Sequence, residues 1–276
     1  MGKPANIDPR TVEGFGEEWA TFDQFELDEA EHRELFEGYF SRFPFEDLKD
    51  GEGFDLGCGS GRWAALVAPK VGKLHCIDAA AKALEVAKRR LGDAPNVEFH
   101  LASVDQIPLP DESQDFGYSL GVLHHIPDTQ AAMDSCVRKL KRGAPFLVYL
   151  YYSFDNRPWW YRGVWKATEA VRIGVSRLPF RLRKATTNVI AAGVYLPMAR
   201  TARLLEKLGM NVEDFPLSPY RHRTFYVMKT DALDRFGTRL EQRFSRVEIR
   251  EMMHRSGLRD VIFSDWGNWV ACGWKA

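Results

Sequence analysis

Three glycines at alternate positions follow a short apolar run. The stretch FDLGCGSGRWA spans residues 54–64, and in it Gly57, Gly59 and Gly61 follow the strand residue Asp55. A single glycine would fit a tight turn without a ligand, whereas three at this spacing favour a loop that holds a nucleotide against bare backbone. A dinucleotide-binding loop has the spacing G-x-G-x-x-G, which this stretch lacks. Asp55 places a carboxylate where the positively charged end of a ligand, such as an amino-acid ammonium, could be met.

Predicted strands and helices alternate around this loop. The strands are expected at 51–57, 73–78, 97–102, 116–123 and 145–152, and the helices at 60–68, 80–91 and 128–140. Strands that alternate with helices predict a parallel, doubly wound α/β sheet.

A second run of regular elements closes the chain. Ser245 and Glu248 form a capping-box pattern, which predicts a helix at 246–257. The two β-rich segments that follow lie at 258–265 and 268–275. The Trp-Gly turn signal at 266–267 predicts that they pair as a hairpin.

The chain divides into four segments by composition and pattern. They are an N-terminal helical cap at 1–51, a core at 52–152, a largely helical insertion at 153–240, and a C-terminal helix and hairpin of the core at 241–276. The cap is assigned from aromatic residues at helical spacing, among them Phe36, Tyr39, Phe40 and Phe43.

Composition limits the class of protein. The formal net charge is zero, so the whole-chain charge gives no reason to expect nucleic-acid binding. The four cysteines, Cys58, Cys76, Cys136 and Cys272, show no CxxC spacing, which predicts buried thiols and no zinc site. No run of about 18 apolar residues occurs, and MGKPANIDPR lacks an apolar signal core, so we expect a cytoplasmic protein.

Several stretches resemble motifs of one enzyme family in the same order. FDLGCGSGRW resembles the first motif of class I S-adenosylmethionine-dependent methyltransferases, and LHCIDAA is similar to their acidic strand end. ASVDQIPLPDESQDFGYSLGVLHHIPD is similar to their third and fourth motifs, and VRKLKRGAPFLVYLY to the approach to the fifth strand. The resemblance covers 52–152 and 243–276 and is of the ubiquinone/menaquinone-methyltransferase-like, small-molecule type. It implies a Rossmann-like seven-stranded sheet with a C-terminal reversed β-hairpin.

The resemblance also implies S-adenosyl-L-methionine as the cofactor. The residues it assigns to the cofactor are Asp55, Gly57, Cys58, Gly59, Gly61, Asp78, Ala79, Ser103, Val104, Asp105, Leu120 and Gly121. Asp78 would accept both ribose hydroxyls, and Gly121 would let backbone approach the sulfonium. The family's usual Gly-Asp-Ala-Glu is Ala-Ser-Val-Asp at 102–105 here, which leaves the partner of the adenine open within 103–105.

Two aromatic residues of the cap are further candidates for the cofactor site. Phe15 and Trp19 stand at helical spacing on an otherwise polar segment. They suit a lid over the methionine end of the cofactor, and ordinary packing onto the core explains them equally well.

Methyl transfer is an in-line displacement, and it needs a base only if the acceptor must lose a proton. The candidates for that base are His125, which fits the family's recurrent histidine position, and its neighbour His124. In many relatives that histidine shapes the site without acting as a base, and both roles stay open. The weaker candidates are Tyr151, Tyr152, Tyr220, Arg221 and His222. No acidic cluster stands near the fourth strand, so we expect a reaction that does not depend on a metal and assign no metal-binding residues.

The expected function is methyl transfer to a small-molecule acceptor, at oxygen, with the cap and the insertion forming the acceptor pocket. One alternative is a lipid-like or quinone-type acceptor at a membrane surface. Another is an S-adenosylmethionine-binding protein without methyl transfer, and the weakest is a purely structural α/β domain. The signatures of enzymes that methylate amino groups of nucleic acids are missing after the fourth strand, so we expect no nucleic-acid partner.

The charges of two segments bear on the acceptor. Between Arg157 and Lys207 the chain has eleven Lys and Arg against two Glu, a net charge of +9, whereas residues 1–53 carry −10. Such a positive field would attract an anionic small-molecule acceptor or an anionic membrane surface. The two segments could instead simply neutralise each other.

Overall fold

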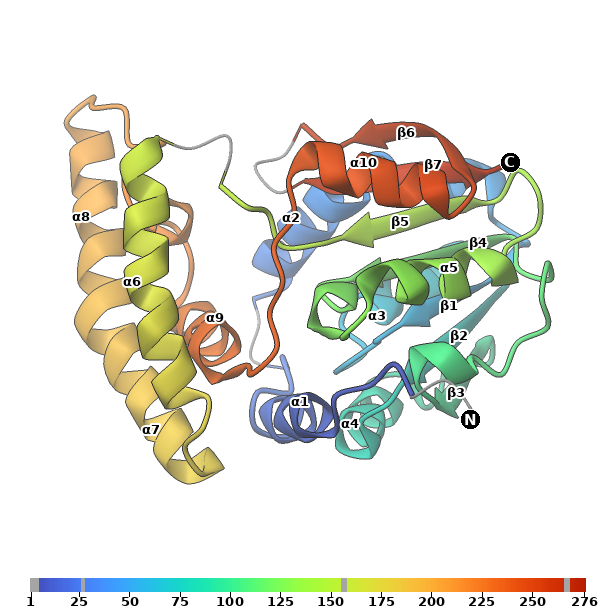
Figure 1. Cartoon of the computed structure of the whole chain (residues 1–276), viewed down its shortest axis with the longest axis horizontal. Helices are drawn as coiled ribbons and strands as arrows, with labels where there is room; N and C mark the ends of the chain where they lie inside the picture. The colour runs from blue at the N-terminus through green and yellow to red at the C-terminus, as the bar shows by residue number, and fades with distance from the viewer. Residues whose placement is uncertain (1–4, 26–27, 155–157, 266–268) are drawn as a thin grey trace. The chain divides into compact units, whose positions relative to one another are not determined.

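A computed structural model describes residues 5–25, 28–154, 158–265 and 269–276. Its seven strands are β1 (Glu52–Leu56), β2 (Lys73–Asp78), β3 (Val97–Leu101), β4 (Phe116–Leu120), β5 (Pro145–Tyr149), β6 (Leu258–Phe263) and β7 (Val270–Lys275). They form one sheet in the order β3-β2-β1-β4-β5-β7-β6, in which β7 runs antiparallel to β5 and β6 (Figure 1). This confirms the predicted doubly wound sheet with its reversed hairpin. The predicted turn at 266–267 lies outside the described residues.

Helices cover both faces of the sheet and form two apolar layers. The α-helices packed on it or beside it are α1 (Pro9–Thr21), α2 (Glu29–Phe40), α3 (Ala64–Val67), α4 (Ala81–Leu91), α5 (Thr129–Lys139) and α10 (Arg246–Arg255). The layer under α5 and α10 includes Phe54, Met133 and Ile249, and the layer under α2, α3 and α4 includes Phe40 and Leu74 (Figure 1). The predicted capping box of Ser245 and Glu248 starts α10.

The glycine loop delays the helix that follows β1. Gly57, Gly59 and Gly61 all have left-handed backbone, with φ of +76°, +54° and +73°. A β-carbon at Gly57 would lie 2.3 Å from a methyl carbon of Val122, so the close approach of the two chain segments also requires glycine there. Because this conformation extends to Gly61, α3 begins at Ala64, and the prediction of a helix from residue 60 was wrong at its start.

The connection from β3 to β4 contains little regular secondary structure. Between Leu101 and Phe116 it contains the 3₁₀ turn η3 (Val104–Gln106) and no α-helix, and every residue of this stretch is described. The end of the sheet formed by β2 and β3 is therefore less covered on the α5 side, and Glu98 of β3 is exposed there.

The helical insertion forms a compact unit of its own. The first unit comprises the described residues of 1–24, 32–153 and 240–276, and the second those of 25–31 and 154–239. The second contains α6 (Trp159–Val175), α7 (Phe180–Ile190), the π-helical turn η5 (Ala191–Tyr195), α8 (Leu196–Lys207), the 3₁₀ turn η6 (Ser218–Tyr220) and α9 (Phe225–Gly237). Its small core joins α6, α8 and α9 through residues such as Val175, Ala199 and Met228.

Two properties expected from composition can be compared with the structure. All four cysteines are buried and form no disulfide, as predicted. Within the described ranges, every helix is too short or too polar to cross a bilayer.

Candidate active site

One cavity lies at the carboxyl ends of β1, β2 and β4, within the first unit. Its volume is about 120 Å³, which greatly exceeds the roughly 10–15 Å³ that a single water requires. Its walls are Asn6, Ile7, Asp8, Thr11, Val12, Phe15, Trp19, Leu56, Gly57, Ile77, Asp78, Ala79, Ala80, Ala102, Ser103, Val104, Leu120, Gly121, Val122, His125 and Ile126. Carboxyl ends of parallel strands are where open α/β sheets bind ligands.

Asp78 ends β2 and lines the cavity with its carboxylate fixed by backbone. The N–H of Gly59 donates to Oδ2 at 2.9 Å, and the N–H of Ala80 donates to Oδ1 at 2.8 Å. Burial raises the pKa of Asp78, and these backbone hydrogen bonds partly oppose the rise. Each carboxylate oxygen has a second lone pair, so Asp78 can still accept hydrogen bonds from a ligand.

Asp55 lies in the protein interior, away from the cavity wall that holds Asp78. It is buried and is not among the residues that line the cavity. Burial raises the pKa of Asp55 to about 8, and the nearby Asp78 adds to the rise. Behind the glycine loop the structure therefore places a carboxyl group whose burial favours the protonated form. Its predicted contact with a ligand ammonium stays a prediction.

The segment after β3 supplies one wall of the cavity. Ser103 and Val104 line it, together with Ala102. The hydroxyl of Ser103 donates to Oδ1 of Asp105, and this hydrogen bond lowers the pKa of Asp105. Asp105 itself is not a lining residue, so Ser103 and Val104 are the parts of this segment that a ligand would meet.

Leu120 and Gly121 form the wall at the end of β4. Gly121 has a φ of +79°, and a β-carbon built on it meets no atom within 4 Å. A side chain at this position would extend into open space beside the cavity, so glycine keeps that space available. Among the other predicted residues of the loop, Gly57 lines the cavity, as does Ala79 after β2, whereas Cys58, Gly59 and Gly61 do not.

The two histidines after β4 are placed differently. His125 lines the cavity, and its Nδ1 lies 2.7 Å from the carbonyl oxygen of Leu240. A carbonyl only accepts, so Nδ1 carries the proton, and in the neutral ring the lone pair is on Nε2. His124 is fully buried and does not line the cavity. Burial holds its pKa well below the usual range, so the ring is uncharged.

The weaker candidates have structural partners. Tyr151 packs on His124 with ring centroids 3.9 Å apart, and Tyr152 packs on Trp269 at 5.6 Å. In the second unit, Tyr220 packs on Tyr195 with ring centroids 5.3 Å apart.

Two polar candidates of the second unit share one carboxylate. Arg221 and His222 both contact Glu206, at 2.8 Å and 2.7 Å. These contacts give each side chain a role in holding its own unit together.

Helix α1 forms one wall of the cavity, and the sequence predicted only two of its lining residues, Phe15 and Trp19. Phe15 and Trp19 line the cavity as its predicted aromatic pair, with the Phe15 ring 4.9 Å from that of His125. The Trp19 indole nitrogen lies 3.0 Å from where a β-carbon at Gly59 would stand. The aromatic pair therefore reaches both the glycine loop and the candidate base.

The residues just before α1 also line the cavity, and sequence reasoning missed them. The Asn6 side chain makes two hydrogen bonds with the backbone of Asp128, at 2.8 Å and 2.9 Å. Asp8 caps α1 by accepting from the N–H of Thr11 at 2.7 Å. The Asp-Pro pair at 8–9 is a recognisable helix start, and it would have predicted where α1 begins.

Comparison with known proteins identifies the domain that contains this cavity. Residues 54–148 match the family model described as "Methyltransferase domain". The chain carries a class I S-adenosylmethionine-dependent methyltransferase domain. The match begins in β1 and ends in β5.

One of the curated relatives that the chain matches is itself named a methyltransferase. The chain is 30% identical over 165 residues to a ubiquinone biosynthesis O-methyltransferase of Paracidovorax citrulli, covering 55% of this chain and 64% of that protein. It is 35% identical over 101 residues to an uncharacterized 37.1 kDa protein in a transposon of Streptomyces fradiae, covering 35% of this chain and 29% of that protein. The chain thus spans less than two thirds of these curated relatives.

A solved structure is similar in fold along nearly the whole chain. It is an S-adenosylmethionine-dependent methyltransferase of Thermotoga maritima, with a TM-score of 0.52 and 15% identity. The likeness covers 96% of this chain and 100% of that one. At this identity the likeness shows a shared fold.

Proposed function

We propose that the protein transfers a methyl group from S-adenosylmethionine to a small-molecule acceptor, at oxygen. One observation carries the proposal: a single cavity joins bare backbone at Gly57 and Gly121, the carboxylate of Asp78, and the side chain of His125. The O-methylating relative from Paracidovorax citrulli supports oxygen as the acceptor atom.

The residues present fit the cofactor. Glycine at 121 keeps open the space that a β-carbon would enter, and the carboxylate of Asp78 is fixed at the cavity wall. Asp78 would hold the ribose hydroxyls, and Ser103 and Val104 would hold the adenine. S-adenosylmethionine, when bound, supplies an electrophilic methyl carbon. The protein then needs to hold the acceptor in line with that carbon, and such positioning accounts for much of the acceleration of this kind of reaction.

His125 is suited to take the proton of a hydroxyl acceptor. Its Nδ1–H is held by the carbonyl of Leu240, so Nε2 carries the lone pair of the neutral ring. This hydrogen bond also fixes the orientation of the ring at the cavity wall. A base at this point removes the charge that would otherwise develop on the acceptor oxygen.

The proposal is tested by incubating the protein with S-adenosylmethionine labelled in the methyl group and a panel of phenols, catechols, carboxylic acids and amines. Label in a hydroxylated acceptor, with release of S-adenosylhomocysteine, is the expected result. Cofactor binding without label transfer to any acceptor would favour a binding protein that does not methylate. Transfer to amines alone would overturn the assignment to oxygen.

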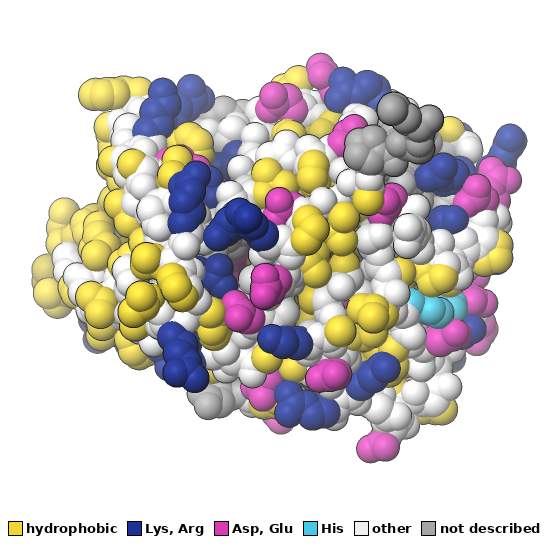
Figure 2. All heavy atoms as spheres, turned by 60° about the horizontal axis from the view of Figure 1, so that its bottom comes forward, with side chains coloured by type: hydrophobic (Ala, Val, Ile, Leu, Met, Phe, Trp, Pro, Cys, Tyr) yellow, Lys and Arg dark blue, Asp and Glu magenta, His cyan; other side chains and the backbone are white. Residues whose placement is uncertain are grey.

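A lipid-like acceptor at a membrane surface is the second candidate, and the second unit favours it. Large apolar side chains on its helices or directly after them are exposed, including Trp159 at 86%, Val189 at 70% and Leu208 at 69%. Figure 2 shows hydrophobic side chains gathered over these helices, with Lys and Arg side chains among them. Exposed apolar side chains beside basic ones are typical of helices that lie on anionic membranes.

Liposome sedimentation tests this candidate. The full chain should sediment with anionic vesicles at low salt, and the double variant Val189→Asp/Leu208→Asp should stay in solution. The matched control is Val247→Asp on α10, which changes an exposed apolar residue of the first unit. If the wild-type chain ignores vesicles while its KM rises steeply with salt, the acceptor is an anionic small molecule. Kinetics that do not depend on salt, with an uncharged acceptor, would mean that the local charges only neutralise each other.

A further inference from the structure

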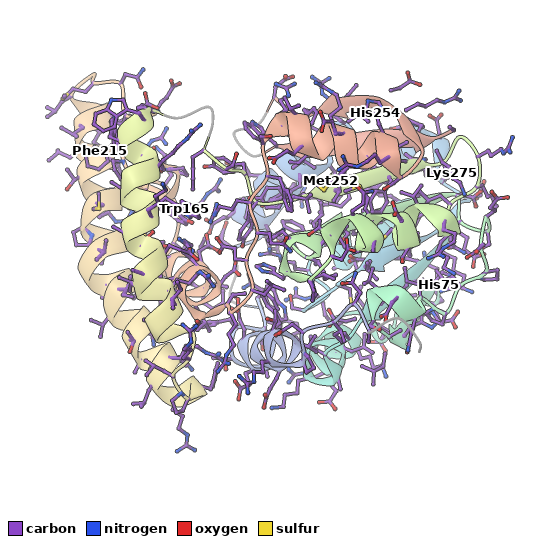
Figure 3. All side chains as sticks on the ribbon, viewed as in Figure 1. His75, Trp165, Phe215, Met252, His254 and Lys275 are labelled. Atoms are coloured by element: carbon purple, nitrogen blue, oxygen red, sulfur yellow. The ribbon has the colours of Figure 1, made fainter. Side chains whose placement is uncertain are left out.

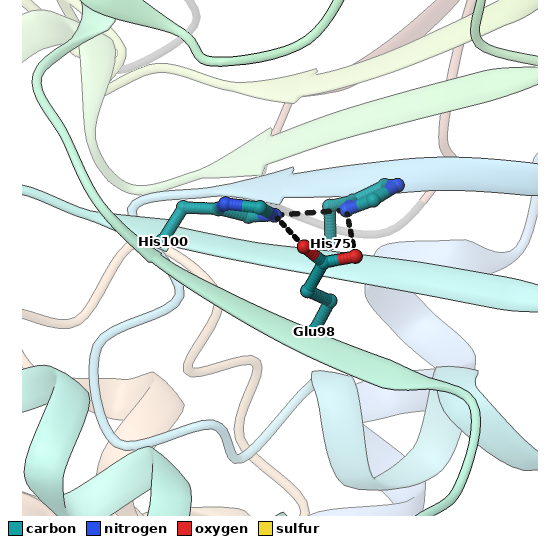
Figure 4. Close-up of side chains that lie close together, drawn as sticks. All are labelled: His75, Glu98 and His100. Atoms are coloured by element: carbon teal, nitrogen blue, oxygen red, sulfur yellow. Dashed lines mark hydrogen bonds and ion pairs between the residues drawn. The ribbon is translucent and has the colours of Figure 1, made fainter.

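We propose that His75, Glu98 and His100 form a binding site for a divalent transition metal of the zinc type, separate from the cofactor cavity. Nδ1 of His75 lies 2.9 Å from Nε2 of His100. The carboxylate of Glu98 lies 3.7 Å from each of these nitrogens (Figure 4). Two imidazoles and a carboxylate are a donor set that zinc prefers. None of the three residues lines the cofactor cavity.

The sheet itself brings the three side chains together. His75 of β2 is the register partner of Glu98 of β3, and His100 stands two residues after Glu98. Residues two apart on a strand point to the same face, so all three lie on the α5 side of the sheet, the side of Ile77. Figure 3 labels His75, which lies on β2. Because rigid strands carry the donors, little ordering would be needed on binding.

A carboxylate orients His75 for this role. Nε2 of His75 lies 2.7 Å from Oε1 of Glu52. A carboxylate only accepts, so Nε2 carries the proton and Nδ1 presents its lone pair toward His100. A carboxylate that holds the far nitrogen of a metal-binding histidine is a usual part of zinc sites. His100 then donates its Nε2–H to Nδ1 of His75. When a metal ion binds between these two nitrogens, His100 takes its other neutral tautomer, with the proton on Nδ1.

The distances fit a metal after small movements. Zinc–nitrogen bonds of about 2.0–2.1 Å at tetrahedral angles place neighbouring donor atoms about 3.3 Å apart. The two nitrogens would separate by about 0.4 Å, and the carboxylate would approach by a similar amount. Because the β3–β4 connection has no α-helix and the Glu98 side chain is half exposed, a water can complete the coordination.

Lys73 competes with the metal. Its ammonium lies 3.0 Å from Oε2 of Glu98 and 3.6 Å from Oε1 of Glu52. The Lys73 side chain is 43% exposed and can turn into solvent. Binding a cation would therefore displace this ammonium. Removing the ammonium should therefore strengthen binding.

The site would join β3, the edge strand, to β2 and so stabilise the sheet. A ligand that binds only the folded state raises stability in proportion to the logarithm of its concentration over Kd. The expected result is one Zn²⁺ per full-length chain by titration calorimetry, with a rise in Tm that EDTA reverses. His100→Gln and Glu98→Gln should each weaken binding at least tenfold, and Lys73→Met should strengthen it several-fold. His254→Gln on α10 is the matched control and should bind as the wild type does.

Cobalt(II) separates this site from the buried cysteines. Four-coordinate Co²⁺ with nitrogen and oxygen donors gives visible absorption without the thiolate charge-transfer bands that cysteine ligands add. The proposal predicts the first spectrum in the wild type and its loss in His100→Gln. The proposal would be overturned if the wild type failed to bind Zn²⁺ or if its Co²⁺ spectrum showed thiolate bands. It would also be overturned if His100→Gln and Glu98→Gln bound Zn²⁺ as tightly as the wild type does. None of these outcomes depends on methyl transfer.

Discussion

The two compact units of this chain place their chemistry in different ways. The first gathers polar groups from several strand ends around one cavity, and most of these groups are held by backbone hydrogen bonds. The second has a small core and turns apolar side chains outward, with eleven of the fourteen exposed large hydrophobic residues in the described part of the chain. Under the proposed function, the cofactor chemistry depends on the first unit, and contact with a surface or an acceptor is assigned to the second. Substitutions in one unit should therefore spare the function of the other.

The largest expected effect is on turnover in His125→Gln. The variant removes the lone-pair nitrogen at the cavity while leaving a side chain of similar length. General bases contribute about 10²–10⁴-fold to rate, so kcat for a hydroxyl acceptor should fall by at least a hundredfold with cofactor affinity unchanged. The control is His222→Gln in the second unit, which should keep full kcat. An unchanged kcat in His125→Gln would mean that this histidine only shapes the site.

Asp78→Ala should have the next largest effect, on cofactor affinity. Hydrogen bonds to a charged acceptor contribute about 1.5–3 kcal/mol, so binding of S-adenosylmethionine should weaken by roughly ten- to a hundredfold. Calorimetry measures the change, and a thermal melt checks that the contacts with Gly59 and Ala80 are not needed for folding. The control in the second unit is Glu206→Gln. Equal affinity in Asp78→Ala and the wild type would contradict the assigned role.

Asp55 should give the first unit a pH dependence of stability. Its pKa is raised to about 8 in the folded state by burial, so between about pH 5 and 7 the folded chain holds a proton that the unfolded chain has lost. The free energy of unfolding should therefore fall as pH rises, by about 1.4 kcal/mol per pH unit, until the folded pKa is passed. Asp78, whose pKa is also raised, acts in the same direction. The free energy of unfolding of Asp55→Asn, measured with denaturant, should depend less on pH than that of the wild type. Asp93→Asn, at an exposed position, should keep the pH dependence of the wild type.

The smallest expected effect is optical. Trp19 lines the cavity beside the glycine loop, so its fluorescence should change when the cofactor binds. Trp19→Phe should lose this change, and Trp159→Phe, at an exposed position of the second unit, should retain it. A change that survives in Trp19→Phe would mean that α1 packs on the core without responding to the ligand.

Much of the first unit could be predicted because its signals are local. Alternating strands and helices, the glycine spacing, and the capping box of Ser245 and Glu248 each occupy a short stretch of sequence. The start of α3 at Ala64 was missed because the left-handed backbone extends through Gly61. The cavity wall from Asn6 to Val12 was missed because it depends on a long-range contact of Asn6 with Asp128.

Other features depend on register and burial, which no local pattern reports. His75 and Glu98 meet because β2 and β3 pair in one register, and 22 residues separate them in the chain. His124 and His125 differ in that only the His125 ring lines the cavity. The sequence shows two adjacent identical residues and does not indicate which of them faces the cavity. The raised pKa of Asp55 follows from burial behind the loop, whereas the sequence suggested only a carboxylate next to glycine.

Calorimetric titration of the wild-type chain with S-adenosylmethionine, S-adenosylhomocysteine and NAD tests the central claim most directly. The cavity with Asp78 at its wall and a G-x-G-x-G loop predicts one binding site per chain for the first two ligands and no measurable binding of NAD. Tight binding of NAD with no binding of S-adenosylmethionine would contradict the account.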